Sequence, residues 1–479
     1  MVQDGVIPGC RVIDLMLHAR YALHTFVSPH DDKRAGVGAR DVRPGVAGAH
    51  PLGRTMQGMT LRFEGALVRA GRPDLPDARI EVGDDGRISS LEQASDGAAR
   101  KVLVPGFANG HSHAGMAALR GLGDGLPLLE WLRVVMAAES LLTEDDVLWS
   151  LRLSLAEMIR GGTTAVADAF LWNERLVEAA VEAGIRIAPG VAVFGPEGVP
   201  YEAAGGQPLD GQIAMAERIG EAFRGHPLVR PTYGVHAVYT SGPEVFARVA
   251  ERAAGNGMGV QVHLSESPAE VAEALAARGE TPIETAARTG LLTPSTVIAH
   301  AVHATDDDLA LIAASGASIV HNPGSNLKLG SGIARVTRMR EAGIRVALGT
   351  DGPASNDALD PLRELRLALQ LQRGSLERAD ALSVDDGLEM LTVNGYEALG
   401  FEPTALEPGD PADLVAVSAD SVHAEPFHSP SGFLGWVATG ADVTDVVVAG
   451  RPLLRDGELL TLDEERIRYE VARIAARLR

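Results

Sequence analysis

The sequence contains a single cysteine, Cys10, in 479 residues. One thiol cannot form a disulfide within the chain, so a disulfide-stapled scaffold is excluded. Zinc sites with two or more cysteine ligands are excluded for the same reason, including the site of nucleobase deaminases whose zinc is bound by one histidine and two cysteines.

Long apolar runs are also missing. No run of about 18 uncharged apolar residues occurs, which argues against a membrane-spanning helix. The best apolar stretch near the N-terminus, Val12–Val27, is interrupted by Asp14, His18, Arg20 and His24, so it does not resemble a secretory signal peptide. We therefore expect a cytoplasmic protein with no membrane partner.

Positive charge is scarce relative to negative charge. The chain has 43 Lys and Arg against 64 Asp and Glu, a formal net charge of −21. Nucleic acids and anionic membranes are bound through basic surfaces that displace counterions, so we expect neither as a partner. Lysine is rarer still, because Lys33, Lys101 and Lys328 are the only ones.

Residues 1–55 lack the periodicity of helices or strands and mix His, Gly, Pro and Arg. This composition predicts a disordered extension. A mis-assigned start is the alternative, because Met56 and Met59 directly precede a clean strand pattern. Alternating apolar residues up to residue 101 then predict short strands joined by a turn.

Strand-like runs return after the central part of the chain, at Ala412–Val417 and Val443–Val448, and a helical pattern covers Asp463–Leu478. Strands before and after the central part can pair with each other. We therefore predict a small flanking β domain built from residues 56–101 and 406–479.

Between residues 102 and 405, short apolar runs rich in β-branched residues alternate with amphipathic helical patterns. The predicted strands are Val102–Phe107, Thr163–Ala167, Ile185–Phe194, Val229–Val235, Gly259–His263, Thr296–His300, Ala317–His321 and Ile344–Gly349. Eight strand–helix units predict an α/β fold with a (β/α)8 barrel of the TIM type over 102–405. An open doubly wound sheet would show a glycine-rich phosphate loop after an early strand, and the sequence has none.

Polar side chains that can bind a metal follow most of these predicted strands. They are His111 and His113, His236, His263 and Glu266, His300 and His303, His321 and Asn322, and Asp351. Barrels of this kind carry the active site at the C-terminal ends of their strands. The pattern therefore predicts an active site at one mouth of the barrel.

His111 and His113 are separated by one residue, so both rings lie on the same face of a strand. With His263 and Asp351 they would supply three neutral nitrogens and one carboxylate. This set suits one divalent metal, Zn²⁺ first and Fe²⁺ as the alternative, with a position left open for water. Such an ion lowers the pKa of water from about 15.7 to about 7, and Asp351 can accept the proton released.

Glu266 and His300 complete the predicted catalytic set with Asp351. Glu266 follows His263 by three residues and has the reach of a general acid/base. By protonating a ring nitrogen while hydroxide attacks the neighbouring carbon, it would turn an amine into a leaving group. His300 would hold the attacking water or the developing charge.

Several segments resemble the chlorohydrolase/deaminase branch of the amidohydrolase superfamily, and most closely the 5′-methylthioadenosine/S-adenosylhomocysteine deaminases. The segments are Val104–His113, Leu119–Leu132, His263–Ser267, Ile298–His303, His321–Gly332, Leu348–Asn356 and Pro408–Val415. The resemblance runs from about Met59 to the C-terminus. It implies a small heterocyclic substrate and a homo-oligomer, either a dimer or a tetramer.

The resemblance also assigns roles to individual residues. Carried over one by one, it places metal at His111, His113, His263 and Asp351, proton transfer at Glu266 and His300, and substrate contact at His236. It implies that Glu130 contacts ribose hydroxyls, that Trp131 beside it also contacts the substrate, and that Asn326 shapes the pocket wall. Binuclear members commonly bridge two metals with a carboxylated lysine, and the absence of lysine between Lys101 and Lys328 favours a mononuclear site.

Two departures from the family pattern lie beside the predicted pocket. His236-Ala-Val-Tyr-Thr240 stands where His-Ala-Pro-Tyr-Thr is usual, and Ala114-Gly115 stands where Leu-Pro is usual. Both bear on the substrate rather than on the metal chemistry.

The leading hypothesis is hydrolytic deamination of a purine nucleoside of the adenosine, S-adenosylhomocysteine or 5′-methylthioadenosine type, with release of ammonia. Alternatives are a triazine chlorohydrolase or aminohydrolase, a deaminase of guanine, another nucleobase or a pterin, and a formimino hydrolase. A barrel without activity would be expected to have lost metal ligands, and none is missing here.

Overall fold

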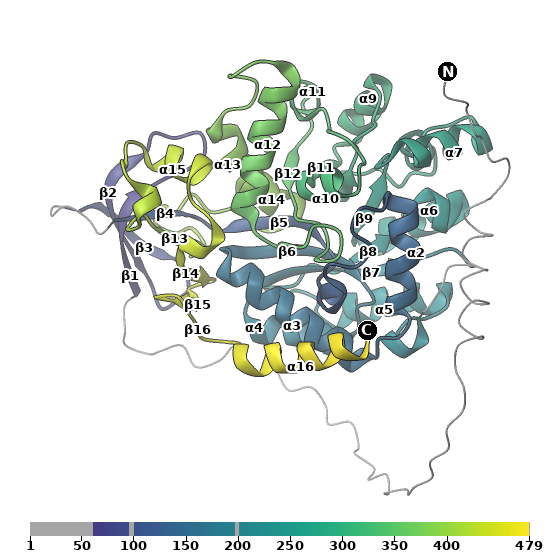
Figure 1. The fold of residues 1–479 in the computed structure, drawn as a ribbon, viewed down its shortest axis with the longest axis horizontal. Helices are drawn as coiled ribbons and strands as arrows, with labels where there is room; N and C mark the ends of the chain where they lie inside the picture. The colour runs from purple at the N-terminus through teal and green to yellow at the C-terminus, as the bar shows by residue number, and fades with distance from the viewer. Residues whose placement is uncertain (1–60, 95–99, 197–200, 479) are drawn as a thin grey trace, which may run out of the picture. The chain divides into compact units, whose positions relative to one another are not determined.

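A computed structural model describes residues 61–94, 100–196 and 201–478 (Figure 1). The prediction for residues 1–55 lies outside these ranges. Among the helices described, none is both long and apolar enough to cross a membrane.

The predicted (β/α)8 barrel is confirmed. Its parallel strands are β5 (Phe107–Ser112), β6 (Thr163–Phe170), β7 (Arg186–Val193), β8 (Thr232–Val235), β9 (Gly259–Leu264), β10 (Thr296–His300), β11 (Ser318–His321) and β12 (Val346–Leu348). Each strand pairs in parallel with its neighbour in the chain. The amide of Asp351, just beyond β12, donates to the carbonyl of His111 in β5 at 3.0 Å, so the last strand returns to the first.

Helices cover the outside of the barrel (Figure 1). They are α2 (Leu128–Glu139), α3 (Glu144–Arg160), α4 (Glu174–Ala183), α5 (Leu209–Ala222), α6 (Val238–Asn256), α7 (Pro268–Arg278), α8 (Pro282–Arg288), α9 (Asp306–Ser315), α10 (Pro323–Lys328), α11 (Val336–Glu341), α12 (Pro361–Leu376), α13 (Val384–Leu391) and α14 (Val393–Ala398). Local sequence fixes many ends: α9, for example, starts at a capping box of Thr305 and Asp308 and stops at left-handed Gly316.

The flanking sheet is also confirmed, and it joins both ends of the described chain. Its strand order is β16-β15-β14-β13-β4-β1-β2-β3. The strands are β1 (Leu61–Leu67), β2 (Leu75–Val82), β3 (Ile88–Gln93), β4 (Lys101–Pro105), β13 (Leu414–Ser418), β14 (Val443–Val448), β15 (Arg451–Arg455) and β16 (Glu458–Leu459). Helices α15 (Pro430–Trp436) and α16 (Glu464–Arg477) complete the C-terminal part.

The prediction that Val102–Phe107 is the first barrel strand is wrong. β4 belongs to the flanking sheet, where it pairs in parallel with β1 and antiparallel with β13. The chain passes to the barrel through Pro105-Gly106, and β5 starts only at Phe107. Glycine is required at this junction, because a Cβ on Gly106 would lie 2.1 Å from the Oγ1 of Thr164.

A buried ion pair joins the barrel to the flanking sheet. Arg186, at the start of β7, donates from Nε and Nη2 to the two carboxylate oxygens of Asp413, at 2.5 and 3.0 Å. The hydroxyl of Tyr396 donates to the same carboxylate at 2.8 Å, and the amide of Ala449 does so at 2.6 Å. Asp413 directly precedes β13, so this network fixes the sheet on the barrel.

Candidate functional site

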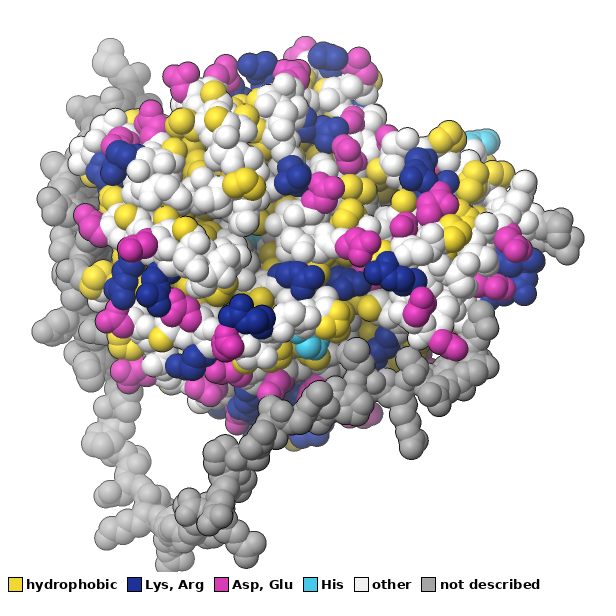
Figure 2. Space-filling model, turned by 180° about the vertical axis from the view of Figure 1, so that it is seen from behind, with side chains coloured by type: hydrophobic (Ala, Val, Ile, Leu, Met, Phe, Trp, Pro, Cys, Tyr) yellow, Lys and Arg dark blue, Asp and Glu magenta, His cyan; other side chains and the backbone are white. Residues whose placement is uncertain are grey.

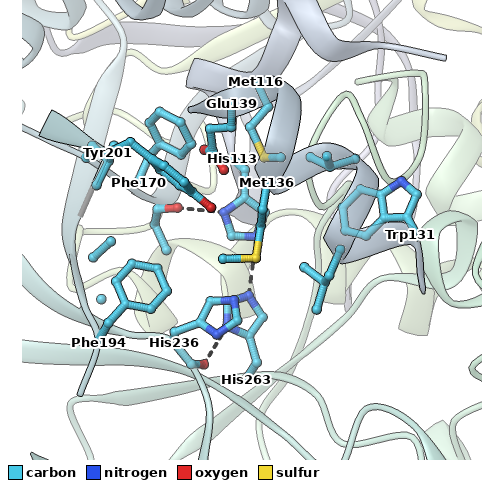
Figure 3. A pocket seen from close by; sticks show the side chains of 16 residues that line it. His113, Met116, Trp131, Met136, Glu139, Phe170, Phe194, Tyr201, His236 and His263 are labelled. Carbon is cyan, nitrogen blue, oxygen red and sulfur yellow. Dashed lines mark hydrogen bonds between the residues drawn. The ribbon is translucent and has the colours of Figure 1, made fainter. Parts of the chain in front are cut away.

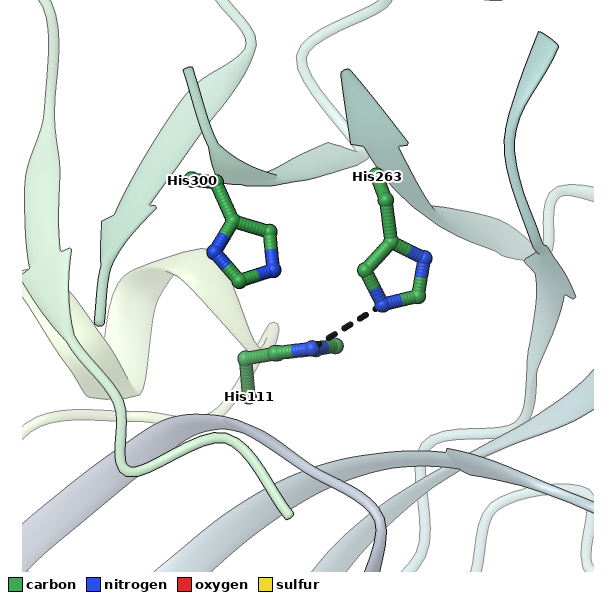
Figure 4. A group of neighbouring side chains, drawn as sticks. All are labelled: His111, His263 and His300. Atoms are coloured by element: carbon green, nitrogen blue, oxygen red, sulfur yellow. Dashed lines mark hydrogen bonds between the residues drawn. The ribbon is translucent and has the colours of Figure 1, made fainter. Parts of the chain in front are cut away.

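Three imidazoles and one carboxylate meet at the C-terminal end of the barrel strands. His111 lies in β5 and His113 directly follows it, while His263 lies in β9 and Asp351 follows β12. Figure 4 shows the rings of His111 and His263 turned toward each other, with His300 from β10 beside them. The structure therefore brings together all four residues predicted as metal ligands.

The nitrogen and oxygen atoms of this group have the spacing of a coordination shell. The Nε2 of His263 lies 3.1 Å from that of His111 and 3.3 Å from that of His113. The Oδ1 of Asp351 lies 3.5 Å from His111 Nε2 and 3.3 Å from His113 Nε2. Ligands about 2.0 Å from one ion in tetrahedral geometry are about 3.3 Å apart, so each of these four distances is of the size expected for two ligands of one cation. His111, His113 and Asp351 lie close enough together to hold an ion, and so do His111, His263 and His300.

The other ring nitrogens of two of these histidines are held by backbone carbonyls. His113 Nδ1 donates to the carbonyl of Ala169 at 2.6 Å, and His263 Nδ1 donates to that of His236 at 2.7 Å. These bonds fix the tautomer that leaves the Nε2 lone pairs free for a metal. Burial lowers the pKa values of His111 and His263, which keeps both rings neutral.

Glu266 and His300 stand beside the four predicted ligands. The Nε2 of His300 lies 3.7 Å from Glu266 Oε2 and 4.0 Å from Asp351 Oδ2. The amide of Asn326 donates to His300 Nδ1 at 2.8 Å, so the ring proton of His300 is on Nε2 and points toward these carboxylates. Burial, and then the charge of Asp351, raises the pKa of Glu266 well above its ordinary value. This shift favours the protonated form of Glu266, as a general acid requires.

Glu270, which the sequence did not single out, positions the turn that carries Glu266. Its carboxylate accepts from the amides of Ser265 at 3.2 Å and of Glu266 at 2.7 Å. Glu270 is buried at the start of α7, capped by Ser267. Glu270 follows Glu266 by four residues in the sequence. This spacing is equally typical of two glutamates on the surface of a helix, so it did not identify Glu270 as a site residue.

Several residues at the C-terminal ends of the barrel strands have strained backbone conformations. Ser265, His300 and Asp351 each adopt a left-handed conformation, with φ values of 53°, 75° and 60°. Residues other than glycine rarely adopt this conformation, and those that do are found often at functional sites. These strained residues lie in the turns that position Glu266, His300 and the carboxylate of Asp351.

A pocket extends from the histidines at the mouth of the barrel. Its polar lining residues are His113, Trp131, Glu139, Tyr201, His236 and His263. The rest of the wall is apolar, and Figure 3 shows the rings of Phe170, Phe194 and Trp131 around the space. His236 is held by Thr240, 2.8 Å from Nδ1 to Oγ1, and burial lowers its pKa to about 3.

The pocket holds polar groups that have no partner within the described chain. The indole nitrogen of Trp131 and the hydroxyl of Tyr201 are buried without a hydrogen bond. The carboxyl of Glu139 is buried too, and burial raises its pKa to about 8. Buried polar groups are normally satisfied, so these three indicate where a ligand supplies the missing hydrogen bonds.

The residues that the sequence predicted to contact the substrate differ in their position relative to the pocket. Trp131 lines the pocket as expected, whereas Glu130 is exposed on α2 and is not among its lining residues. Trp131, Val135 and Glu139 are four residues apart and share the helix face toward the pocket, and this spacing could have pointed to Glu139. Asn326 holds His300 and does not line the pocket.

The remaining strand-end histidines have other surroundings. The Nε2 of His303 donates to the carbonyl of Ser331 at 2.6 Å. The ring of His321 is buried, and neither of its nitrogens has a hydrogen-bond partner within the described chain.

A parallel barrel whose mouth gathers histidines and carboxylates at the edge of an apolar pocket is the architecture of a metal-dependent hydrolase. Comparison with known proteins agrees with this class. The sequence pattern of the amidohydrolase family matches residues 102–453. The chain therefore belongs to the amidohydrolase family, and with the deaminases among its relatives this makes it a hydrolase that acts on carbon–nitrogen bonds other than peptide bonds.

Individual relatives cover most of the chain. A 5-methylthioadenosine/S-adenosylhomocysteine deaminase of Dictyoglomus thermophilum is 37% identical over 400 residues, 83% of this chain and 92% of the relative. An adenosine deaminase of Xanthomonas campestris, solved with bound zinc, has a TM-score of 0.82 and 31% identity, covering 87% of this chain and 98% of that one. Atrazine chlorohydrolase of Arthrobacter aurescens TC1, complexed with zinc, has a TM-score of 0.78 and 25% identity, covering 86% and 99%.

Proposed function

We propose that the protein is a metal-dependent deaminase that replaces the amino group of a purine nucleoside by oxygen and releases ammonia. The observation that carries the proposal is the placement of the Glu266 carboxyl and of His300 beside the histidines and Asp351 that could hold one cation, at the edge of a largely apolar pocket. The deaminases among the relatives support the same reaction.

His111, His113, His263 and Asp351 would hold one divalent metal, which we propose to be zinc, as in the two solved neighbours. A bound cation of this kind supplies a water molecule whose pKa is lowered from about 15.7 to about 7. Neutral imidazoles and a carboxylate without a cationic partner are the donor set that such an ion requires.

The chain's own residues then move the protons. Asp351 accepts the proton of the water, and its Oδ2 is oriented by the hydroxyl of Ser325, which donates to it at 2.6 Å. Glu266 gives its proton to the ring nitrogen next to the carbon under attack. The proton that Asp351 accepted then passes to the amino group, which leaves as ammonia, and the added hydroxyl returns a proton to Glu266 as the carbonyl forms. His300 directs its Nε2 proton toward the oxygen that gains charge.

Substrate recognition falls to the groups that lack partners. We propose that Glu139 accepts hydrogen bonds from ribose hydroxyls, while His236 contacts the heterocycle and the ring of Trp131 forms a wall. A sugar diol offers two donors, and hydrogen bonds from both hydroxyls would favour the carboxylate form of Glu139 over the protonated form that burial favours in the empty pocket.

A triazine hydrolase is the second candidate, favoured by the apolar wall and by the likeness to atrazine chlorohydrolase. A chlorinated alkyl triazine has no diol for Glu139. The nucleoside proposal therefore accounts for one more feature of the pocket.

The test is ammonia release by the purified, zinc-loaded protein from 5′-methylthioadenosine, 5′-deoxyadenosine, adenosine, guanine and atrazine. We expect turnover of the adenine nucleosides. Glu266→Gln should lower kcat by roughly 10²–10⁴-fold and keep the metal, because it removes only the transferable proton. Glu178→Gln, an exposed glutamate on α4, is the matched control and should behave as wild type. Silence across the adenine nucleosides would refute the proposal.

A further inference from the structure

His113 differs from the other two histidines proposed as metal ligands in its backbone support. His111 lies within β5 and His263 within β9, whereas His113 follows the last residue of its strand. The pairing of β5 with β6 ends where Ser112 lies opposite Asp168. Groups that bind a metal have to be held within about 0.5 Å of their productive position. The place of the His113 ring therefore depends on the turn that follows the strand.

The peptide after His113 is held at both of its polar groups by buried side chains. The amide of Ala114 donates to Oδ2 of Asp168 in β6, and its carbonyl accepts from the hydroxyl of Ser154 in α3 at 2.8 Å. Asp168 and Ser154 are both fully buried. The ring of His113 is held by the same end of β6, because its Nδ1 donates to the carbonyl of Ala169 at 2.6 Å. Two elements, β6 and α3, therefore fix the turn that carries His113.

The turn also packs closely against β6. A Cβ on Gly115 would lie 2.4 Å from two carbons of the Phe170 ring, which belongs to the same strand as Asp168. The turn is therefore in direct contact with this strand, and the hydrogen bonds of Ala114 fix how it is seated there.

Asp168 is a buried carboxyl that the proposed proton transfers do not use. Its Oδ1 accepts from the indole nitrogen of Trp172 at 3.0 Å, and Oδ2 accepts from the amide of Ala114. A carboxylate accepts through both oxygens, whereas the amide of asparagine has one accepting oxygen and an NH₂ group that only donates. The two N–H donors therefore require a carboxylate at this position.

We propose that Asp168 and Ser154 are positioning residues that keep the ring of His113 where a single ion requires it. They act through the peptide of Ala114 and are not among the proposed ligands. The inference rests on the metal site of the proposed function and adds to it two residues that set its affinity. Replacing a group that orients a metal ligand typically weakens metal binding by about 10–100-fold.

The test is the affinity of the metal-free protein for zinc, measured by competition with a chromogenic chelator. Asp168→Asn keeps the size of the side chain but places an NH₂ group opposite one of the two N–H donors. It should raise the Kd for zinc by about 10–100-fold, and Ser154→Ala, which removes one hydrogen bond, should raise it by about tenfold.

Asp442→Asn is the matched control. Asp442 is a buried aspartate of the flanking part, and its Oδ2 accepts from the amide and the hydroxyl of Thr439, both at 2.9 Å. Like Asp168, it accepts from a backbone amide and a side chain, but it is not among the residues of the site. Asp442→Asn should lower Tm and leave the Kd for zinc unchanged.

Cobalt gives a second readout that a purely structural role would not change. The visible absorption of bound Co²⁺ depends on how its ligands are arranged. We expect the cobalt-loaded Asp168→Asn and Ser154→Ala proteins to have altered spectra, and the Asp442→Asn protein to have the spectrum of wild type.

A zinc Kd and a cobalt spectrum equal to those of wild type in Asp168→Asn would overturn the inference. If Asp168→Asn does not yield folded protein, Ser154→Ala decides, and an unchanged Kd in that variant overturns the inference too. Equal losses of affinity in Asp442→Asn would also overturn it, because general destabilisation would then explain them. Wild-type protein that binds no zinc would instead refute the metal site of the proposed function.

Discussion

At the scale of single residues, Glu139 shows most clearly how burial prepares a side chain for a ligand. Glu130 and Glu139 lie on the same helix, but only Glu139 faces the pocket. Glu139→Gln should raise KM for adenine nucleosides about tenfold or more, because an amide is a weaker acceptor for a diol than a carboxylate. Glu130→Gln is the matched variant. A larger rise in KM for Glu130→Gln than for Glu139→Gln would restore the role that the sequence gave to Glu130.

The same carboxyl makes the stability of the protein depend on pH. Its pKa is about 8 in the folded chain and near 4.5 when exposed, so the folded state binds the extra proton between these values. The contribution of Glu139 to the free energy of unfolding is therefore fully present below about pH 4.5 and is lost as pH rises through about 8. Glu139→Gln should raise Tm relative to wild type at pH 9 and have little effect at pH 5. A Tm difference that is the same at both pH values would contradict the assigned burial.

Glu270 is a positioning residue, and its substitution should change the pH dependence of kcat/KM. Glu270→Gln keeps one oxygen for the turn but removes a negative charge that, after burial and Asp351, helps to raise the pKa of Glu266. We expect kcat to fall about tenfold and the alkaline limb of kcat/KM to move to lower pH. The groups facing Glu266 that also titrate or carry charge are His300, Asp351 and Tyr239.

The control for Glu270 is Ser267→Ala, which removes the cap of α7 and leaves the charge of Glu270 in place. It should lower Tm without moving the pH profile. If both variants left the profile unchanged, the role of Glu270 would be purely structural.

At the scale of elements, the alternation of strands and helices could be predicted, because the spacing of apolar residues and the positions of β-branched residues can be read from a single sequence. The first strand could not. Val102 and Val104 are as buried in the flanking sheet as barrel residues are in the core, so their pattern is the same in either sheet. The spacing of His111 and His113 predicted a shared face. The spacing of Trp131 and Glu139 likewise indicates a shared face of α2, but which face of α2 lies toward the pocket depends on tertiary packing.

The ion pair of Arg186 with Asp413 is the contact between elements that mutation should test first. Asp413→Ala would leave a buried guanidinium and the hydroxyl of Tyr396 without their acceptor, at a cost of about 3–5 kcal/mol. We expect a clearly lower Tm by calorimetry. Glu221→Ala removes the exposed pair with Arg224 and should change the free energy of unfolding by less than about 1 kcal/mol. Similar losses for both variants would mean that the buried pair does not hold the sheet to the barrel.

At the scale of the whole molecule, composition predicted a negatively charged surface without a basic face. Figure 2 shows acidic and basic side chains interspersed over the side that it draws. The expected dimer or tetramer and the cytoplasmic location stay predictions, and light scattering of the purified chain measures the first of them.

Metal removal is a test that concerns the entire enzyme. Dialysis against a strong chelator should abolish ammonia release, and one equivalent of zinc per chain should restore it, because all four proposed ligands serve a single ion. Ferrous iron is the comparison, and higher activity with iron would assign the native metal differently. His263→Ala should bind less than one tenth of an equivalent and recover no activity. Full activity of the chelated protein would contradict a metal-dependent reaction.

The left-handed residues at the barrel rim have a consequence for the evolution of this fold. Ser265, His300 and Asp351 each hold a backbone shape that glycine would adopt at lower cost, by about 1–3 kcal/mol per position. Selection for thermal robustness alone would favour glycine at such turns. At His300 and Asp351, however, glycine would remove the groups proposed to direct a proton and to bind the metal, so at these two positions a less strained backbone and a complete site exclude each other.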